Sequence, residues 1–193
     1  MPREGKAKIL TSDEFKRVIK MQHGKTLAQR NIALLSLSYF CGLRAKELAS
    51  LTFGDVLTGQ RELREEINLK PHQTKGGKRR LAYLTHDRLR DALTDYLSTR
   101  ATEALTAPLF KSQKGGAFSP NSLQRLFSLL YQEAGIEGAS SHSGRRSFAT
   151  HLLQQGASIK EVQVLMGHSS IQTTAIYVQE DPVRLGNLIR RLR

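Results

Sequence analysis

A set of polar residues stands where this sequence predicts helix starts, a β-turn or short loops, the places where functional side chains are mounted on a rigid scaffold. They are Arg44, Lys75 or Lys78, His142, Arg145, His168 and Tyr177. The stretch "HSGRR" places His142 and Arg145 three residues apart at a helix N-terminus, beside amides and a dipole that favour anions. This pair is suited to binding a phosphate.

Each of these residues also has an ordinary structural interpretation. Arg44 could form a surface i, i+3 pair with Glu47, and His142 could cap its helix beside solvated arginines. His168 stands in a short loop, where an imidazole is either a satisfied cap or a phosphate ligand. Tyr177 lies in an amphipathic segment, where a tyrosine is more often part of the core. No single position separates chemistry from packing.

The elements that must position these residues are mostly helical. Thr11 and Glu14 have the capping-box spacing that opens a first helix. Residues 27–43 are apolar nearly all round, which is typical of a buried central helix, here ending at Gly42. A helical stretch over 44–53 follows directly. Further helices are expected over 87–98, 119–135, 143–156, 158–167 and 170–178.

Residues 62–84 break the helical pattern. Partial period-two alternation in "ELREEINL" and "KRRLAYL" flanks "KPHQTKGG", whose Gly76 and Gly77 can supply turn conformations. A β-hairpin or small sheet is predicted there. Together the patterns predict one mostly α domain over residues 1–193, of α+β class, with a small antiparallel β element.

The charge of the chain indicates its partner. Thirty Lys plus Arg stand against 17 Asp plus Glu, and the net charge of +13 favours a polyanion, nucleic acid first. Membrane-surface binding is the rival, but the chain has no Trp and no basic amphipathic helix with an aromatic face. Apolar runs are too short to span a bilayer and the start lacks a signal peptide's apolar core, so a cytoplasmic protein is expected. The single cysteine, Cys41, predicts a buried thiol.

Four segments together resemble the tyrosine recombinase (phage integrase) family. They are "CGLRAKELASLTFGDV", "TKGGKRRLAYL", "SSHSGRRSFATHLLQQG" and "LMGHSSIQTTAIYV", which run from about Phe40 to Val178. Each segment is weak evidence alone, but four in the family's order, ending in a Gly-His and Tyr pair at family-like spacing, are specific. The resemblance implies the tyrosine recombinase catalytic-domain fold and site-specific recombination of DNA, with no cofactor.

The resemblance also implies a role for each residue. Tyr177 would attack a DNA phosphodiester, forming a 3′-phosphotyrosyl bond and freeing a 5′-hydroxyl. Because a phenol is a poor nucleophile near neutral pH, it needs a proton acceptor, for which the family likeness indicates His142. Arg44 and Arg145 would hold the non-bridging oxygens, and His168 would add a further hydrogen bond to the phosphate.

Supporting residues follow from the same likeness. Lys75, in the turn, would protonate the leaving 5′-oxygen, with Lys78 and, less so, Lys70 as alternatives. Glu47 would hold Arg44. Contacts with DNA are expected from Lys78, Arg79 and Arg146. No metal is expected, because the chain lacks a His-Glu-x-x-His helix or a clear carboxylate set.

The sequence departs from the family pattern in two places. The usual His-x-Leu-Arg-His box reads "HSGRR", with Gly144 before the arginine and Arg146 where a second His often stands, so altered helix packing with retained chemistry is expected. Only about forty residues precede Arg44, so the N-terminal domain with which many members close a clamp on DNA is expected to be absent. Short single-domain relatives occur among the fimbrial phase-variation recombinases, and the catalytic portion of a longer protein would look the same.

Three functional hypotheses remain open at this point. The leading one is a recombinase that acts as a homo-tetramer on two double-stranded DNA sites, is a monomer without DNA, and works with accessory DNA-bending proteins at the nucleoid. Its tail, residues 181–193, would pack either on its own domain or on a neighbouring protomer. The alternatives are a type IB topoisomerase-like enzyme that nicks and reseals, and a DNA-binding regulator that keeps the fold without turnover.

Overall fold

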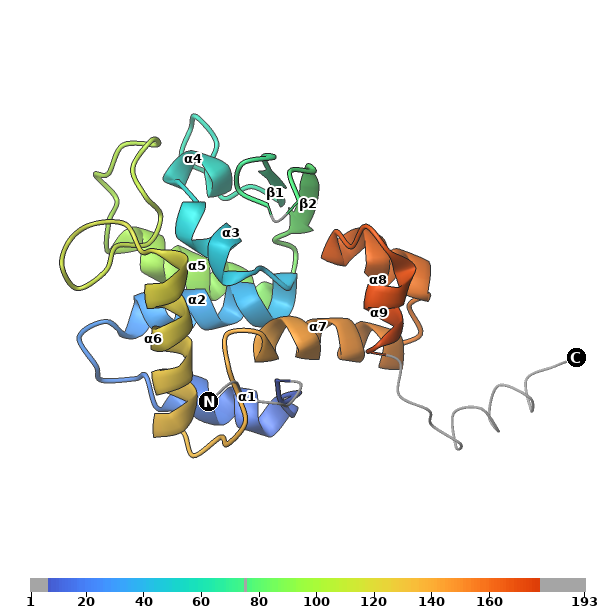
Figure 1. Ribbon diagram of the computed structural model, residues 1–193. Helices are drawn as coiled ribbons and strands as arrows, with labels where there is room; N and C mark the ends of the chain where they lie inside the picture. The colour runs from blue at the N-terminus through green and yellow to red at the C-terminus, as the bar shows by residue number, and fades with distance from the viewer. Residues whose placement is uncertain (1–6, 75, 178–193) are drawn as a thin grey trace, which may run out of the picture.

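Residues 7–74 and 76–177 are described by a computed structural model, and they form a mostly helical body with a two-stranded sheet at one side (Figure 1). This confirms the predicted fold class. The helices are α1 (Ser12–Lys20), α2 (Ala28–Cys41), α3 (Ala45–Ser50), α4 (Phe53–Val56), α5 (Asp87–Ser98), α6 (Pro120–Glu133), α7 (Ser143–Gln154), α8 (Ile159–Met166) and α9 (Ile171–Ala175). The strands are β1 (Glu66–Leu69) and β2 (Arg80–Tyr83).

Local capping chemistry sets several of these boundaries. The Thr11 hydroxyl accepts from the Glu14 backbone N–H at 3.1 Å, and the Glu14 carboxylate accepts from the Thr11 N–H at 3.0 Å, so the predicted capping box is confirmed. Ser119 and Ser158 cap α6 and α8 in the same way. The central helix α2 ends at Gly42, whose φ of +61° is the left-handed conformation that glycine adopts at little cost.

The prediction of one helix over residues 44–53 was wrong. The chain forms α3 and α4 with an extended break at Leu51 and Thr52. The Asp55 carboxylate accepts from the Thr52 N–H at 2.8 Å and from its hydroxyl at 3.0 Å, which starts a new helix. Thr52 also pairs with Pro108 in an isolated β-bridge, so a tertiary contact holds the break open.

The predicted β-hairpin is confirmed. Strands β1 and β2 pair antiparallel, with Glu66 opposite Tyr83 and Leu69 opposite Arg80. Gly76 and Gly77 both have positive φ in the connection, as expected for its turn. Burial alternates along β2, so that Arg80 and Ala82 face inward while Leu81 and Tyr83 face outward. An arginine therefore lies on the buried face of the sheet.

Two hydrophobic clusters form the interior. The larger one lies among α1 to α6 and includes the fully buried Leu34, Phe53 and Tyr131. The smaller one lies among α7, α8 and the residues after α9, and it includes Tyr177. Helix α7 packs on α2 and carries α8 and α9 at one side of the molecule (Figure 1). The junction between the two clusters is where the candidate residues meet.

Two further expectations can be compared with this interior. Cys41 is 3% exposed, which confirms the predicted buried thiol, and burial raises its pKa to about 12. Across residues 7–74 and 76–177, the helices are all too short or too polar to cross a lipid bilayer.

Helices α2 and α7 approach closely because of Gly144. A Cβ at Gly144 would lie 2.5 Å from the Ser38 hydroxyl oxygen and 3.0 Å from the Ser38 carbonyl carbon. The backbone of α2 cannot yield in the way a flexible side chain can. The glycine in the "HSGRR" motif is therefore a packing requirement of this fold.

Gly144→Ala should destabilise the protein by about 1–3 kcal/mol in urea unfolding, because overpacking against the α2 backbone outweighs alanine's better helix propensity. The control is Gly59→Ala, where a Cβ meets nothing within 4 Å and φ is not positive, so the free energy of unfolding should change by less than about 0.5 kcal/mol. Unchanged or increased stability for Gly144→Ala would show that the contact is not tight.

Candidate active site

Arg44 and Glu47 form a pair in the interior of the protein. Arg44 is the N-cap residue of α3, directly after the turn that ends α2. The Glu47 carboxylate accepts from Arg44 Nη1 at 2.9 Å and from the Arg44 backbone N–H at 2.8 Å. The Glu47 side chain is 0% exposed and that of Arg44 is 21% exposed. The pair is therefore not the solvated surface pair of the simpler interpretation, and the Arg44 guanidinium reaches solvent from a buried anchor.

The Glu47 carboxylate stays charged despite its burial. Desolvation alone would raise its pKa, but the nearby guanidiniums of Arg80, Arg145 and Arg44 outweigh it and leave the pKa below its ordinary value. A buried carboxylate of this kind persists only with such compensation.

Arg145, on the first turn of α7, is almost completely buried at 4% exposure. Its Nη1 donates to the Gly42 carbonyl at 2.5 Å, and its Nη2 donates to the Met166 carbonyl at 2.5 Å. Burial, together with the charges of Arg44 and Arg80, lowers the pKa of Arg145 to about 9. The side chain is still a cation at neutral pH, but the nearby Glu47 carboxylate only partly offsets its burial and the two neighbouring guanidiniums.

His168 follows Gly167, the left-handed residue that ends α8. Its Nε2 lies 3.1 Å from Arg145 Nη2 and its Nδ1 lies 2.9 Å from the Thr174 hydroxyl. Because a guanidinium can only donate, Nε2 accepts and the ring hydrogen belongs on Nδ1. Burial and the charges of Arg145, Arg44 and Arg80 lower the pKa of His168 to about 4. Without a bound anion the imidazole is therefore neutral.

Tyr177 lies two residues beyond α9 and is 9% exposed. Its ring is nearly parallel to that of His168, with centroids 6.0 Å apart, and Arg146 Cζ lies 5.9 Å from the ring centre. Tyr177 also packs with Leu153 and Met166 in the smaller hydrophobic cluster. It is a packed aromatic and a neighbour of the arginine and histidine cluster at once.

The other predicted site residues are placed less centrally. His142 is exposed at the start of α7, with Nδ1 3.4 Å from the Ser141 hydroxyl. Arg146, expected to contact DNA, donates to the Ala7 carbonyl in addition to its contact with the Tyr177 ring. Lys78 and Arg79 are exposed on the connection before β2. Lys75 lies outside the described residues.

The connection between the strands is anchored to α3 and α4. Lys46 Nζ donates to the Thr74 carbonyl at 3.0 Å. The buried Gln73 amide donates to the Ser50 carbonyl and to the Asp55 carboxylate, both at 3.1 Å. The Thr74 hydroxyl lies 2.7 Å from the Lys78 carbonyl. These contacts fix the loop on both sides of position 75.

A cavity of about 450 Å³ opens beside Arg44 and His168. His168 lines it together with five basic side chains, which are Arg44, Lys78, Arg79, Arg80 and Lys160. No carboxylate from the described part of the chain lines it. Such a lining attracts an anion. A larger cavity of about 770 Å³ lies among α1, α2, β2, α7 and α8, but none of the predicted site residues line it.

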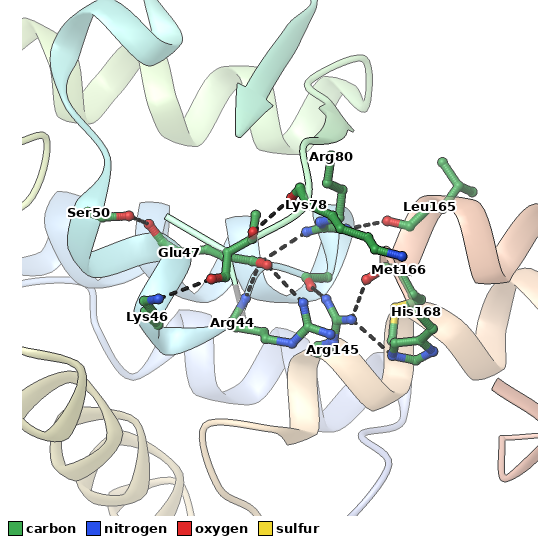
Figure 2. A network of polar contacts seen from close by, with 12 residues as sticks. Arg44, Lys46, Glu47, Ser50, Lys78, Arg80, Arg145, Leu165, Met166 and His168 are labelled. Carbon is green, nitrogen blue, oxygen red and sulfur yellow. Dashed lines mark hydrogen bonds and ion pairs between the residues drawn. The ribbon is translucent and has the colours of Figure 1, made fainter. Parts of the chain in front are cut away.

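Arg80 is the residue that the sequence reasoning missed. Its guanidinium donates to Glu47 at 3.1 Å, and Figure 2 shows it directed at the same carboxylate as Arg44, with Arg145 and His168 alongside. A signal was present, because strict alternation along β2 would have placed Arg80 on the inward face with Ala82. An arginine facing inward on a strand is rarely buried without a partner.

The fold around this site is that of a tyrosine recombinase catalytic domain. It is similar to the crystal structure of XerA recombinase, with a TM-score of 0.77 and 28% identity over 96% of this chain and 65% of the other. It is also similar to XerH site-specific recombinase bound to difH substrate, with a TM-score of 0.72 and 26% identity over 95% of this chain and 53% of the other.

Curated relatives agree with the fold. Tyrosine recombinase XerC of Brucella suis biovar 1 (strain 1330) is 35% identical over 192 residues, which is 95% of this chain and 59% of XerC. Tyrosine recombinase XerD of Pseudomonas putida KT2440 is 35% identical over 173 residues, 86% of this chain and 54% of XerD. The chain thus spans little more than half the length of these relatives. The pattern of the phage integrase family matches residues 8–184, and the chain belongs to that family.

The state of His168 can be tested by pH. Its folded pKa of about 4 lies below its ordinary value near 6.5, so the unfolded chain takes up a proton that the folded site rejects. The contribution of His168 to stability is therefore intact above about pH 6.5 and is lost as the pH falls toward 4. In urea unfolding across this window, His168→Gln should show a shallower loss than wild type. A slope for His168→Gln equal to that of wild type would contradict the assignment.

Proposed function

We propose that this chain is the catalytic part of a site-specific DNA recombinase, which cuts and rejoins DNA strands through a 3′-phosphotyrosyl intermediate. The observation that carries the proposal is a basic cavity lined by Arg44 and His168, with Arg145 bonded to His168 and the Tyr177 ring stacked near that imidazole. Family membership supports it, as do the relatives named tyrosine recombinases and the XerH structure that holds its DNA substrate.

The scissile phosphate enters the basic cavity and supplies the negative charge that the site lacks. Arg44 offers donors to a non-bridging oxygen from its partly exposed guanidinium. Arg145 Nη2 turns from His168 Nε2 to the phosphate, so Nε2 no longer accepts that hydrogen bond. The phosphate anion also favours a hydrogen on Nε2, because it opposes the cationic field that keeps the imidazole neutral. His168 then donates to the phosphate as well.

Transfer then proceeds by displacement at phosphorus. The Tyr177 oxygen bonds to phosphorus as the bond to the 5′-oxygen breaks, and His142 accepts the phenolic proton. Lys75 protonates the departing 5′-oxygen, with Lys78 as the alternative because its side chain lines the same cavity as Arg44 and His168. A 5′-hydroxyl from the exchanging strand reverses these steps and releases Tyr177, so the number of phosphodiester bonds is conserved.

Assembly and context follow from the same proposal. The partner is double-stranded DNA, bound by the basic surface that the net charge of +13 provides. Strand exchange needs four protomers on paired sites, with a monomer in the absence of DNA and accessory DNA-bending proteins as further partners. Its place is the cytoplasm, at the nucleoid. The tail segment 181–193, with its two expected packing modes, lies outside the described residues.

Tyr177→Phe should bind site-containing DNA as tightly as wild type but form no covalent adduct, because only the nucleophilic oxygen is removed. The measurement is denaturing gel mobility of labelled nicked or suicide DNA, with binding followed separately. An adduct with Tyr177→Phe would remove Tyr177 as nucleophile, and no adduct with wild type would favour a DNA-binding regulator. Supercoil relaxation without recombinant product would favour a topoisomerase-like enzyme.

The general acid can be assigned with a 5′-bridging phosphorothiolate, whose thiolate leaving group needs no proton. On ordinary DNA, Lys75→Ala should slow adduct formation by about 10²- to 10⁴-fold, and on the phosphorothiolate the deficit should nearly vanish. Lys78→Ala is the matched control and should be slowed alike on both substrates, through weaker phosphate contact. Rescue of Lys78→Ala in place of Lys75→Ala would reverse the assignment.

A further inference from the structure

Arg80 is a buried cation to which the proposed chemistry assigns no task. Its side chain is 3% exposed. Arg80 Nη2 donates to Glu47 Oε2 at 3.1 Å, and Nη1 donates to the Leu165 carbonyl. Burying a guanidinium is costly unless good partners are present, and these two partners come from different parts of the fold. Arg80 thus links strand β2 to α3 at one end and to α8 at the other.

At the first end, Arg80 limits how Arg44 can pair with Glu47. Glu47 Oε1 accepts from Arg44 Nη1, whereas Oε2 is occupied by Arg80 Nη2 and the Arg44 backbone N–H. An isolated arginine and carboxylate tend to form two parallel hydrogen bonds. With Oε2 occupied, the Arg44 guanidinium is held by one side-chain bond and keeps its other donors for a ligand (Figure 2).

At the second end, Arg80 holds the last turn of α8. It bonds the Leu165 carbonyl, and Arg145 bonds the adjacent Met166 carbonyl, so two cations satisfy the C-terminal end of this helix. Gly167 comes next, and a Cβ there would lie 2.4 Å from Arg80 Cδ. The Arg80 stem thus packs directly against the residue that precedes His168.

We propose that Arg80 is a positioning residue for the reaction, an inference that rests on the proposed function. It keeps the Arg44 guanidinium from being fully taken up by Glu47, and it fixes the α8 end that presents His168 beside Arg145. Although Arg80 lines the cavity, its Nη1 and Nη2 are engaged by Leu165 and Glu47, so it acts through Arg44 and His168.

The first test measures single-turnover adduct formation at saturating DNA. Arg80→Gln should slow it by about 10- to 100-fold, the range typical of residues that orient functional ligands, with DNA affinity little changed. Arg80→Lys should recover part of the rate, because an ammonium keeps the charge but cannot reach both partners as the fork does. A rate equal to wild type for Arg80→Gln overturns the inference.

A double variant separates positioning from simple loss of structure. In the Arg80→Gln background, Glu47→Gln should raise the rate above that of Arg80→Gln alone, because a neutral amide no longer captures Arg44. Urea unfolding should show the double variant no more stable than the single one. If Arg80 only held the fold together, the second substitution would leave the rate the same or lower it further, and that result overturns the inference.

A glycine pair tests the α8 end. Gly167 and Gly135 have nearly equal φ, +60° and +63°, so alanine strains both backbones alike, but only at Gly167 does a Cβ meet Arg80. Gly167→Ala should slow adduct formation as Arg80→Gln does and add little to it in combination, while Gly135→Ala should lower stability alone. Equal slowing by both alanines, or fully additive slowing with Arg80→Gln, overturns the link.

Adduct formation by the wild-type protein distinguishes failure of this inference from failure of the proposed function. If wild type forms no adduct on a suicide substrate, the proposed function fails and the inference fails with it. If wild type forms the adduct and the Arg80 variants match its rate, the recombinase proposal stands and only the role of Arg80 is rejected.

Discussion

Three guanidiniums surround one fully buried carboxylate, and the rest of the site depends on this arrangement. Arg44 and Arg80 bond Glu47 directly, and the charge of Arg145 acts on it as well. One negative charge cannot offset three positive ones in an interior that screens poorly. Burial, together with this imbalance, lowers the pKa values of both Arg145 and His168. A bound anion would offset this excess of positive charge, which is the basis for proposing a phosphate ligand here.

Backbone carbonyls at or near helix ends compensate for this concentration of buried positive charge. Gly42, Leu165 and Met166 each offer a carbonyl to a buried guanidinium, at or near the ends of α2 and α8. Helix ends expose unpaired carbonyls, so they are natural acceptors for cations. The same helix, α7, that carries Arg145 also supplies part of the small cluster in which Tyr177 packs. Arg145 and the proposed nucleophile therefore share one support.

Elements with strong local signals were predicted from the sequence. The Thr11 box and the glycine turn at Gly76 and Gly77 are local, and each depends on residues a few positions apart. The stretch after Arg44 was misjudged because its break is held by Thr52 pairing with the distant Pro108. Gly144 was recognised as unusual in its motif, but the Ser38 backbone that requires a glycine there is over a hundred residues away.

The sequence by itself determined which chemical groups exist and their order along the chain, because motif spacing and helix caps are short-range properties. It also indicated that Glu47 could reach Arg44 one helical turn away. Only the tertiary structure decided that this pair is buried and that Arg80, 33 residues further along, shares its carboxylate while also bonding Leu165, 85 residues beyond Arg80. Which side chains meet across such distances depends on the packing of whole helices and strands, and no local pattern encodes it.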